Sequence, residues 1–386
     1  MSEHNDDALS MDLSEGDLAD DIAPDKAVTW GTDWTVTTII DQLSRGRFDL
    51  EPAFQRRDVW SDRKRARFIE SLILGIPVPQ VILAERPNAR GKFIVLDGKQ
   101  RLRSLQRFAG MDGTPMRLTG LEVLRNLNGK TYDEIREDSA LEQSVAALEN
   151  QAIRAVVLRG WQSESLLYLT FLRLNSNVVG LSPQELRRAL HPGPFMEYAM
   201  QTSAESSQLK EFLGGARSTK PDFRMRDAEI LIRHIALTTR ISEYRGNLRR
   251  FLDETCEIMN REWDEVSPAV ADSAEGLELA MNATNSIFGK HAFRRFSNGR
   301  YESRKNRAVL DCMAFHLQDA TVRAAALSSP ESVRLAFEGA CTQEERFQSS
   351  LTSTTKTRSA VLTRLGIWGR VLSTVTGVKT VDIPEN

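Results

Sequence analysis

The sequence has 386 residues, and its 41% hydrophobic and 27% charged content exclude a disordered, fibrous or membrane-embedded chain. Its apolar runs are short and interrupted by Gly and Pro, and its acidic start lacks the basic and apolar pattern of a signal peptide. We therefore expect a cytoplasmic protein with no membrane partner. Three widely separated cysteines without a CxxC pair argue against a disulfide framework or a zinc site and predict buried thiols: Cys256, Cys312 and Cys341.

The charge is distributed unevenly along the chain. Residues 1–25 hold nine acidic side chains and no Lys or Arg, so the remainder carries 51 basic and 44 acidic side chains. An acidic segment with few aromatic residues cannot bury enough apolar surface to fold alone, which predicts a disordered tail over residues 1–30. We prefer a solubilising role for this tail to an electrostatic gate over the basic body.

Up to residue 160 short apolar runs alternate with helix-like segments, which predicts an α/β domain over residues 31–160. Residues 61–75 have the spacing of an amphipathic helix, with Ser61 as its N-cap. Apolar runs on both sides of residues 86–92 predict a β-hairpin, because Pro, Asn and Gly there favour a turn. Residues 99–110 predict a second amphipathic helix.

A strand-like run at residues 151–158 is followed by helical periodicity to the C-terminus. Ser182, Pro183 and Glu185 have the order of an N-cap, a first-turn proline and a carboxylate near the positive end of a helix dipole. The predicted fold class is α+β: an N-terminal α/β domain followed by an all-helical domain over residues 161–386.

A first candidate for a site is the segment Asp97-Gly98-Lys99-Gln100-Arg101, which follows a predicted strand and opens a predicted helix. Backbone N–H groups at a helix start bind phosphate, Gly98 permits close approach, and Arg101 offers a planar set of donors. Asp97 could hold a magnesium ion that bridges phosphates. The alternative is an ordinary strand-to-helix turn in which Asp97 caps the helix and Arg101 forms a salt bridge.

Two further segments could contribute to such a site. In residues 54–60, Gln55 and Arg56 could meet phosphate or a base, although Arg and Trp side by side also occur in simple loop packing. Arg173 and Asn175 stand at the end of a predicted helix. Asn175 could contact a base or a phosphate, but a lone Asn there is more often a C-cap.

Residues 288–307 form a basic segment with interleaved aromatic residues and a single acid, Glu302. This composition suits nucleic acid, because phosphates supply affinity and rings supply stacking. A solvated helical face with core-facing Phe side chains is the equal alternative. The candidate nucleic-acid contacts are Lys290, Arg294, Arg295, Arg300, Arg304, Lys305 and Arg307.

Other catalytic classes find no support in the motifs. The five histidines form no HExxH and no metal-ligand spacing, and GxSxG, Walker GxxxxGK[ST] and GxGxxG patterns are absent. The sequence therefore favours neither a zinc hydrolase, a serine hydrolase, a P-loop enzyme nor a dinucleotide-binding enzyme.

Several of these segments occur in the order of one family. From about residue 34 to about residue 377 the sequence resembles the GmrSD type IV restriction-endonuclease N-terminal domain family, including that family's helical C-terminal part. The segments that carry the resemblance are residues 54–83, 95–105, 171–190, 224–237 and 342–372.

The resemblance implies a fold similar to ParB and sulfiredoxin, in which a Gly-x-x-Arg-like box, here Gly98 to Arg101, holds nucleotide phosphates. It implies nucleoside-triphosphate and Mg²⁺ binding, with hydrolysis in some members, and restriction of modified phage DNA. Asp97, Gln100 and Arg101 are the implied catalytic residues. The implied nucleotide-binding residues are Gln55, Arg56, Gly98, Lys99, Arg173 and Asn175, and Lys99 departs from the glutamine that is commonest at its position.

Many relatives carry an HNH nuclease, fused or as a partner, and the sequence contains no matching pattern. Two hypotheses follow. The chain is an NTP-binding, NTP-hydrolysing sensor or switch that acts on DNA with a separately encoded nuclease, or it is a non-enzymatic nucleic-acid-binding or adaptor protein whose nucleotide box is only structural. The sequence leaves the base preference and any homo-oligomer open.

Overall fold

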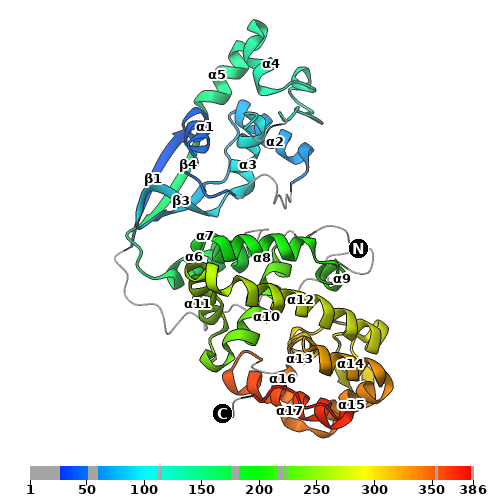
Figure 1. Cartoon of the computed structure of the whole chain (residues 1–386). Coiled ribbons are helices and arrows are strands. Elements are labelled where there is room, and N and C mark those ends of the chain that lie inside the picture. Colours follow the sequence, from blue (N-terminus) through cyan, green and yellow to red (C-terminus); the bar gives the residue numbers. More distant parts are fainter. Residues whose placement is uncertain are drawn as a thin grey trace. The chain divides into compact units, whose positions relative to one another are not determined.

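The computed structural model describes residues 27–383 apart from 51–59, 112, 114, 175–181, 215–220, 223 and 353–354. The described residues up to Leu190 form one compact unit, and those from His191 onward form another. We call them the sheet unit and the helical unit (Figure 1). Within the described part of the chain, no helix is both long and apolar enough to span a bilayer.

The sheet unit combines one four-stranded sheet with short helices. Its strands are β1 (Val28–Thr35), β2 (Val81–Arg86), β3 (Ala89–Asp97) and β4 (Ala152–Arg159). Its helices are α1 (Val36–Ser44), α2 (Asp62–Ile73), α3 (Lys99–Phe108), η3 (Arg125–Leu127), α4 (Tyr132–Glu137), η4 (Ser139–Leu141), α5 (Glu142–Asn150), α6 (Glu164–Leu174) and α7 (Pro183–Leu190).

The strand order in this sheet is β1-β4-β2-β3. β2 and β4 are parallel, whereas β1 pairs with β4 and β2 pairs with β3 in antiparallel register. β2 lies inside the sheet, and its first four residues, Val81 to Ala84, are buried as expected for a central strand. β3 is the last strand in this order, and the candidate box follows its C-terminal end.

Three predicted elements of the sheet unit are confirmed. α2 begins after Ser61, whose Oγ accepts a hydrogen bond from Lys64 N at 3.4 Å. β2 and β3 form the expected hairpin, although β3 already begins at Ala89 inside the predicted turn. α3 buries its apolar stripe of Leu102, Leu105 and Phe108.

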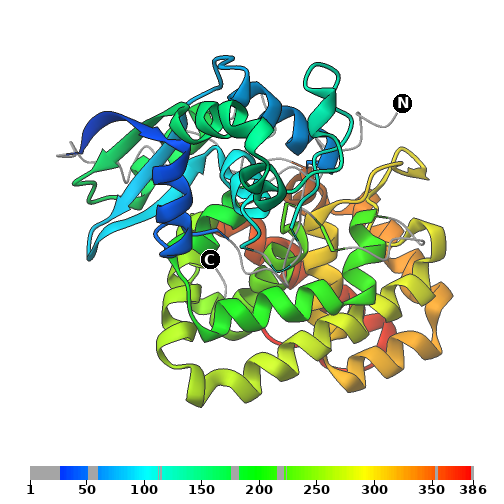
Figure 2. The same ribbon diagram turned by 90° about the horizontal axis from the view of Figure 1, so that it is seen from above.

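In its described residues the helical unit consists of helices and one short β-hairpin. Figures 1 and 2 show this unit from two directions. Its helices are α8 (Pro194–Glu205), α9 (Ser207–Gly214), α10 (Arg226–Arg240), η5 (Ile241–Glu243), α11 (Leu248–Arg261), α12 (Trp263–Phe288), η6 (Gly289–His291), α13 (Arg307–Leu317), α14 (Ala320–Ser328), α15 (Pro330–Gln343), α16 (Glu345–Thr352) and α17 (Arg358–Thr376). Its strands are β5 (Phe296–Ser297) and β6 (Arg300–Tyr301).

α13 is the central helix of this unit, because all of its residues are buried and it contacts α10, α12, α14, α16 and α17. Asp311 on α13 pairs with Arg233 of α10 and with Arg364 of α17, whose Nη2 lies 2.9 Å from Oδ2. Burial lowers the pKa of His316 to about 4, so this side chain is neutral at pH 7. The core therefore combines an apolar interior with buried charges that are paired, two arginines sharing one aspartate.

The boundary between the units lies later than the predicted boundary at residue 160. α6 and α7 follow it in sequence, yet both contact β3 and remain with the sheet unit. Their helical periodicity is correct, but periodicity does not reveal the surface on which a helix packs. The three cysteines are buried free thiols, as expected.

Three strands were not predicted: β1, β5 and β6. β1 starts at Val28, inside the predicted tail, and most of its residues are exposed, so it lacks the alternating pattern of a half-buried strand. The β5–β6 hairpin interrupts the region predicted as entirely helical. Asn298 and Gly299 form its turn, with φ of 51° and 73°. An Asn-Gly pair is a strong sequence signal for a β-hairpin, but helical periodicity alone does not reveal it.

Candidate functional site

Gly98 connects β3 to α3 in a conformation that other residues rarely adopt. Its φ is +96°, and a Cβ placed there would lie 2.7 Å from Cγ1 of Val81. The first helical hydrogen bond of α3 runs from Leu102 N to Gly98 O at 3.0 Å. The backbone N–H groups that precede Leu102 make no hydrogen bond within α3. They are the groups predicted from the sequence to bind phosphate.

Asp97 and Arg101 close the turn around Gly98. Asp97 Oδ1 accepts a hydrogen bond from Gly98 N at 2.6 Å, and its Oδ2 accepts one from Arg101 Nη2 at 3.0 Å. Arg101 Nη2 also donates to the Gln80 carbonyl at 2.9 Å, which fixes the guanidinium against the chain just before β2. The Asp97 side chain is 39% exposed, so the ion pair is open to water on its carboxylate side.

Lys99 extends the box to a second helix. Its Nζ lies 2.9 Å from Oε1 of Glu185 on α7, and both side chains are only 12% exposed. Glu185 also completes a capping box with Ser182, because Oε2 accepts from Ser182 N and Ser182 Oγ accepts from Glu185 N. The structure thus links the box to the predicted start of α7. The cation at Lys99 is neutralised by Glu185 and does not add an uncompensated charge beside a phosphate.

The side chain of Gln100 carries a buried oxygen, Oε1, that accepts no hydrogen bond among the described residues. Arg101 Nε is likewise buried without a hydrogen-bond partner among these residues. The Gln100 backbone carbonyl accepts from Ser104 Oγ at 2.7 Å, so the backbone here is held while the side-chain amide keeps an unused acceptor. A buried unsatisfied acceptor is costly, and a bound donor would relieve it.

Of the four other residues predicted to bind nucleotide, the structure describes only Arg173. Arg173 lies exposed in the last turn of α6. Gln55, Arg56 and Asn175 lie outside the described residues. The structure therefore brings Asp97, Lys99, Gln100 and Arg101 together around Gly98.

The sequence analysis missed a row of charged side chains beside the box. Arg65 on α2 and Arg103 on α3 are 2% and 4% exposed. Asp62 Oδ1 accepts from Arg65 Nη1 at 2.8 Å and from Arg107 Nη1 at 3.2 Å. Arg103 and Arg107 follow Gln100 by three and seven residues and so share its face of α3. This spacing was the signal that could have found them.

Two cations of the basic segment at residues 288–307 are built into the fold. Lys305 Nζ donates to the carbonyl oxygens of Glu211 and Phe212 at 3.1 and 2.9 Å, and burial lowers the pKa of this lysine. Arg307 is buried, and its Nη1 binds Glu229 Oε1 at 2.7 Å. Both side chains thus have contacts within the helical unit that explain their positive charge without a role in nucleic-acid binding.

The remaining cations divide into two groups. Arg295 pairs with Glu302, and Arg294 Nη1 donates to the Glu302 carbonyl at 3.4 Å, so both belong to the hairpin. The aromatic residues of the segment face inward or stack within it. Three cations of the segment are exposed: Lys290, Arg300 and Arg304.

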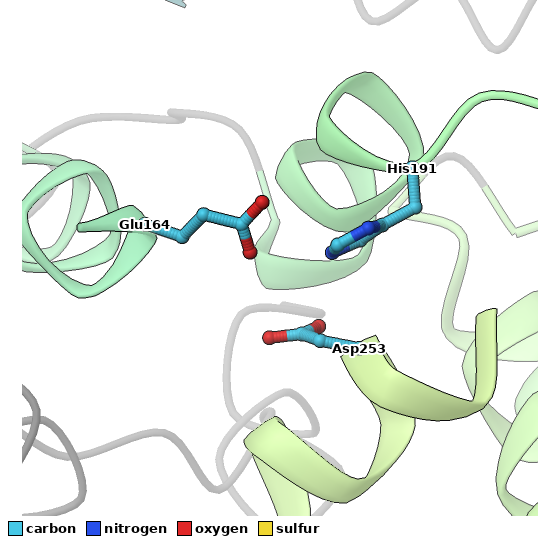
Figure 3. A group of neighbouring side chains, drawn as sticks. All are labelled: Glu164, His191 and Asp253. Atoms are coloured by element: carbon cyan, nitrogen blue, oxygen red, sulfur yellow. The ribbon is translucent and has the colours of Figure 1, made fainter. Parts of the chain in front are cut away.

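Figure 3 shows His191 and Asp253, two side chains of the helical unit that the sequence does not place together. A ring nitrogen and a carboxylate oxygen lie within 4.8 Å of each other. Asp253 also accepts a hydrogen bond from Arg249 Nη1 at 3.0 Å. The third side chain drawn, Glu164, begins α6 in the sheet unit. Asp253 is thus engaged in a buried ion pair of α11.

Residues 36–192 match the family model described as GmrSD restriction endonuclease, N-terminal domain. The match extends from α1 to just beyond α7 and contains the whole box, whereas the residues of the helical unit after 192 lie outside it. Comparison with curated proteins and with solved structures gave no match. The expected similarity to ParB and sulfiredoxin therefore stays a prediction.

Proposed function

We propose that this chain, whose residues 36–192 belong to the GmrSD N-terminal domain family, is a nucleoside-triphosphate-binding regulatory module of a prokaryotic restriction system. It acts with a separately encoded effector nuclease. The observation that supports nucleotide binding best is the left-handed Gly98 between β3 and α3, flanked by the partly exposed Asp97–Arg101 pair. Such a turn combines helix N–H donors, close backbone approach and an exchangeable guanidinium.

In this proposal the Arg101 guanidinium exchanges its bond to Asp97 for a phosphate oxygen. The exchange is inexpensive, because the Asp97 carboxylate is 39% exposed and is rehydrated when the pair opens. Arg101 stays in position through its second bond, to the Gln80 carbonyl. The guanidinium is thus held in place before the ligand arrives.

Asp97 is the residue that would hold Mg²⁺, directly or through water, once Arg101 turns to phosphate. A partly exposed carboxylate next to a phosphate site fits this ion, which usually takes one or two protein carboxylates and several waters. When bound, Mg²⁺ would neutralise charge on the phosphates. Gln100 orients the attacking water, which can donate to its unused buried Oε1, or contacts phosphate through its amide NH2 group.

Lys99 has a positioning role, since its ion pair with Glu185 ties the start of α3 to the start of α7. Gln55, Arg56, Arg173 and Asn175 complete the proposed nucleotide contacts.

Titration calorimetry with ATP, GTP, CTP and UTP in the presence of magnesium tests this proposal. Arg101→Ala removes a charge-assisted hydrogen bond, so affinity should fall by about ten- to a hundredfold. Arg101→Lys should restore only part of it, because an ammonium cannot reproduce the planar fork. Arg154→Ala on β4 is the matched control: this exposed arginine forms a surface pair with Asp33, and its loss should leave binding unchanged.

Two results would overturn the assignment: no binding of any of the four nucleotides, or an Arg101→Ala protein that binds as tightly as the parent. The chain would then be the non-enzymatic adaptor or nucleic-acid-binding protein, and the box an ordinary capped turn. We also propose that the exposed cations of the β5–β6 region, Lys290, Arg300 and Arg304, contact nucleic acid, with DNA favoured.

A further inference from the structure

The helical unit contains a hollow of about 290 Å³ between α16 and α17, two helices that pack against each other. Figure 1 shows both helices near the C-terminal end of the chain. Six of its seven lining residues are polar, and the seventh is Ala360. The polar lining residues are Arg346, Ser349, Ser350, Thr357, Ser359 and Thr363.

Arg346 brings an uncompensated positive charge to this hollow. Among the described residues no carboxylate pairs with its guanidinium, although α16 begins with an acid, Glu345. From Arg346 to Val381 the sequence holds six Lys and Arg and no Asp or Glu. Of these, Arg364 pairs with Asp311 and Lys379 with Asp382, and Arg346 is the charged residue that lines the hollow, so Arg346 is the cation that an anion there would meet.

The hydroxyl groups of the hollow come from both helices. Ser359 and Thr363 are four residues apart on one face of α17, and neither has a hydrogen-bond partner among the described residues. Ser350 on α16 is only 3% exposed and lines the same hollow. Ser350 Oγ donates to the Phe347 carbonyl at 2.7 Å and Ser349 Oγ to the Arg346 carbonyl at 3.1 Å, so Ser359 and Thr363 are the hydroxyl groups that can turn their hydrogens to a ligand.

The wall at the start of α17 is held from behind. Arg364 Nη1 donates to the Thr355 carbonyl at 2.6 Å, and the buried Tyr244 hydroxyl donates to the Lys356 carbonyl. Both carbonyl oxygens are therefore satisfied by donors from other parts of the helical unit. The dipole of the 19-residue α17 adds a favourable field at this end.

We propose that this hollow is a phosphate-binding site of the helical unit, distinct from the nucleotide box of the sheet unit. Its ligand is inorganic phosphate or the phosphate group of a small phosphomonoester. A guanidinium and hydroxyl donors on two sides suit a tetrahedral anion, which offers acceptors in several directions, better than a planar carboxylate. The volume is at the lower end of the range for small-molecule pockets, which favours a small ligand over a polymer.

Thermal unfolding of the full chain measures this binding, because a ligand of the folded state raises the midpoint with its concentration. The experiment uses the Arg101→Ala background, so that the box does not contribute. Inorganic phosphate is titrated against chloride at matched ionic strength, and AMP is titrated in parallel. We expect a saturable rise in the midpoint with both ligands.

Arg346→Ala should weaken phosphate binding by about ten- to a hundredfold. Thr363→Val, which keeps the side-chain shape and removes one donor, should weaken it less. Arg370→Ala is the matched control, since this exposed arginine lies on α17 outside the lining of the hollow. Its midpoint should respond to phosphate as the parent does.

The proposal is overturned if phosphate produces no rise beyond that of chloride, or if the rise survives in Arg346→Ala. It is also overturned if Arg346→Ala leaves phosphate and AMP binding unchanged but weakens binding of a DNA duplex, which would identify a nucleic-acid surface. If the proposed nucleotide binding by the box proves wrong, this result is not affected, because every measurement is made in the Arg101→Ala protein.

Discussion

The ion-pair cluster of Arg233, Asp311 and Arg364 lies in the core of the helical unit, whereas the Asp97–Arg101 pair of the sheet unit is partly open to water. Arg233, Arg364 and Asp311 are each at most 7% exposed. Asp97, in contrast, keeps 39% of its side-chain surface in water. The same two residue types thus form a fixed structural cluster in one unit and an opening pair in the other.

The presence of an ion pair therefore does not by itself distinguish a structural arginine from a ligand-binding one. A buried charge cannot leave its partner, since water does not replace the lost bond. A half-exposed carboxylate can, because hydration offsets the loss. The exposure of the acid, and not the presence of the arginine, separates a site that can exchange its partner for a phosphate from a site that cannot.

The largest expected effect comes from breaking the buried cluster. Asp311→Asn leaves Arg233 and Arg364 without their shared counter-charge, and removal of one partner from a buried ion pair costs about 3–5 kcal/mol. Denaturant unfolding should show a loss of this size. The control is Glu254→Gln on α11, which removes an exposed pair with Arg250 and should change stability by less than about 1 kcal/mol. Equal losses in the two variants would contradict the comparison.

A smaller effect is expected at the box. Gly98→Ala places a Cβ at positive φ and 2.7 Å from Val81, so we expect a loss of about 1–3 kcal/mol in the free energy of unfolding. Gly129→Ala has a similar φ of +82° with nothing within 4 Å, and should cost less because it adds strain without a clash. Thermal and denaturant unfolding of both variants measure the difference. If the two losses are the same, close approach at Gly98 is not a constraint on the turn.

The smallest effect on stability is expected for the exposed cations of the hairpin region. Arg300→Ala with Arg304→Ala should change the free energy of unfolding by no more than about 0.5 kcal/mol per substitution. DNA affinity should nevertheless fall, and its dependence on salt should become less steep by about one unit of slope per lost phosphate contact. Filter binding or fluorescence anisotropy at several salt concentrations measures both. An unaltered slope would identify these side chains as a solvated face.

Local pattern determined much of the sheet unit from the sequence alone. The spacing of Leu102, Leu105 and Phe108 and the N-cap Ser61 predict their helices correctly, because helix starts and apolar stripes depend on residues within a few positions of one another. The order of strand, Gly98 and helix is also local, and so is the capping box of Ser182 and Glu185. The α+β class follows from the same patterns.

Tertiary structure alone decided which charges are paired and which are exposed. Lys99 and Glu185 are 86 residues apart, and Arg364 and Asp311 are 53 apart. Nothing in either segment specifies the other, because such contacts arise only when helices pack. The cations of residues 288–307 can be identified from the sequence. Only the fold shows that Arg307 is buried and Arg304 exposed, because burial depends on neighbours that are distant in the chain.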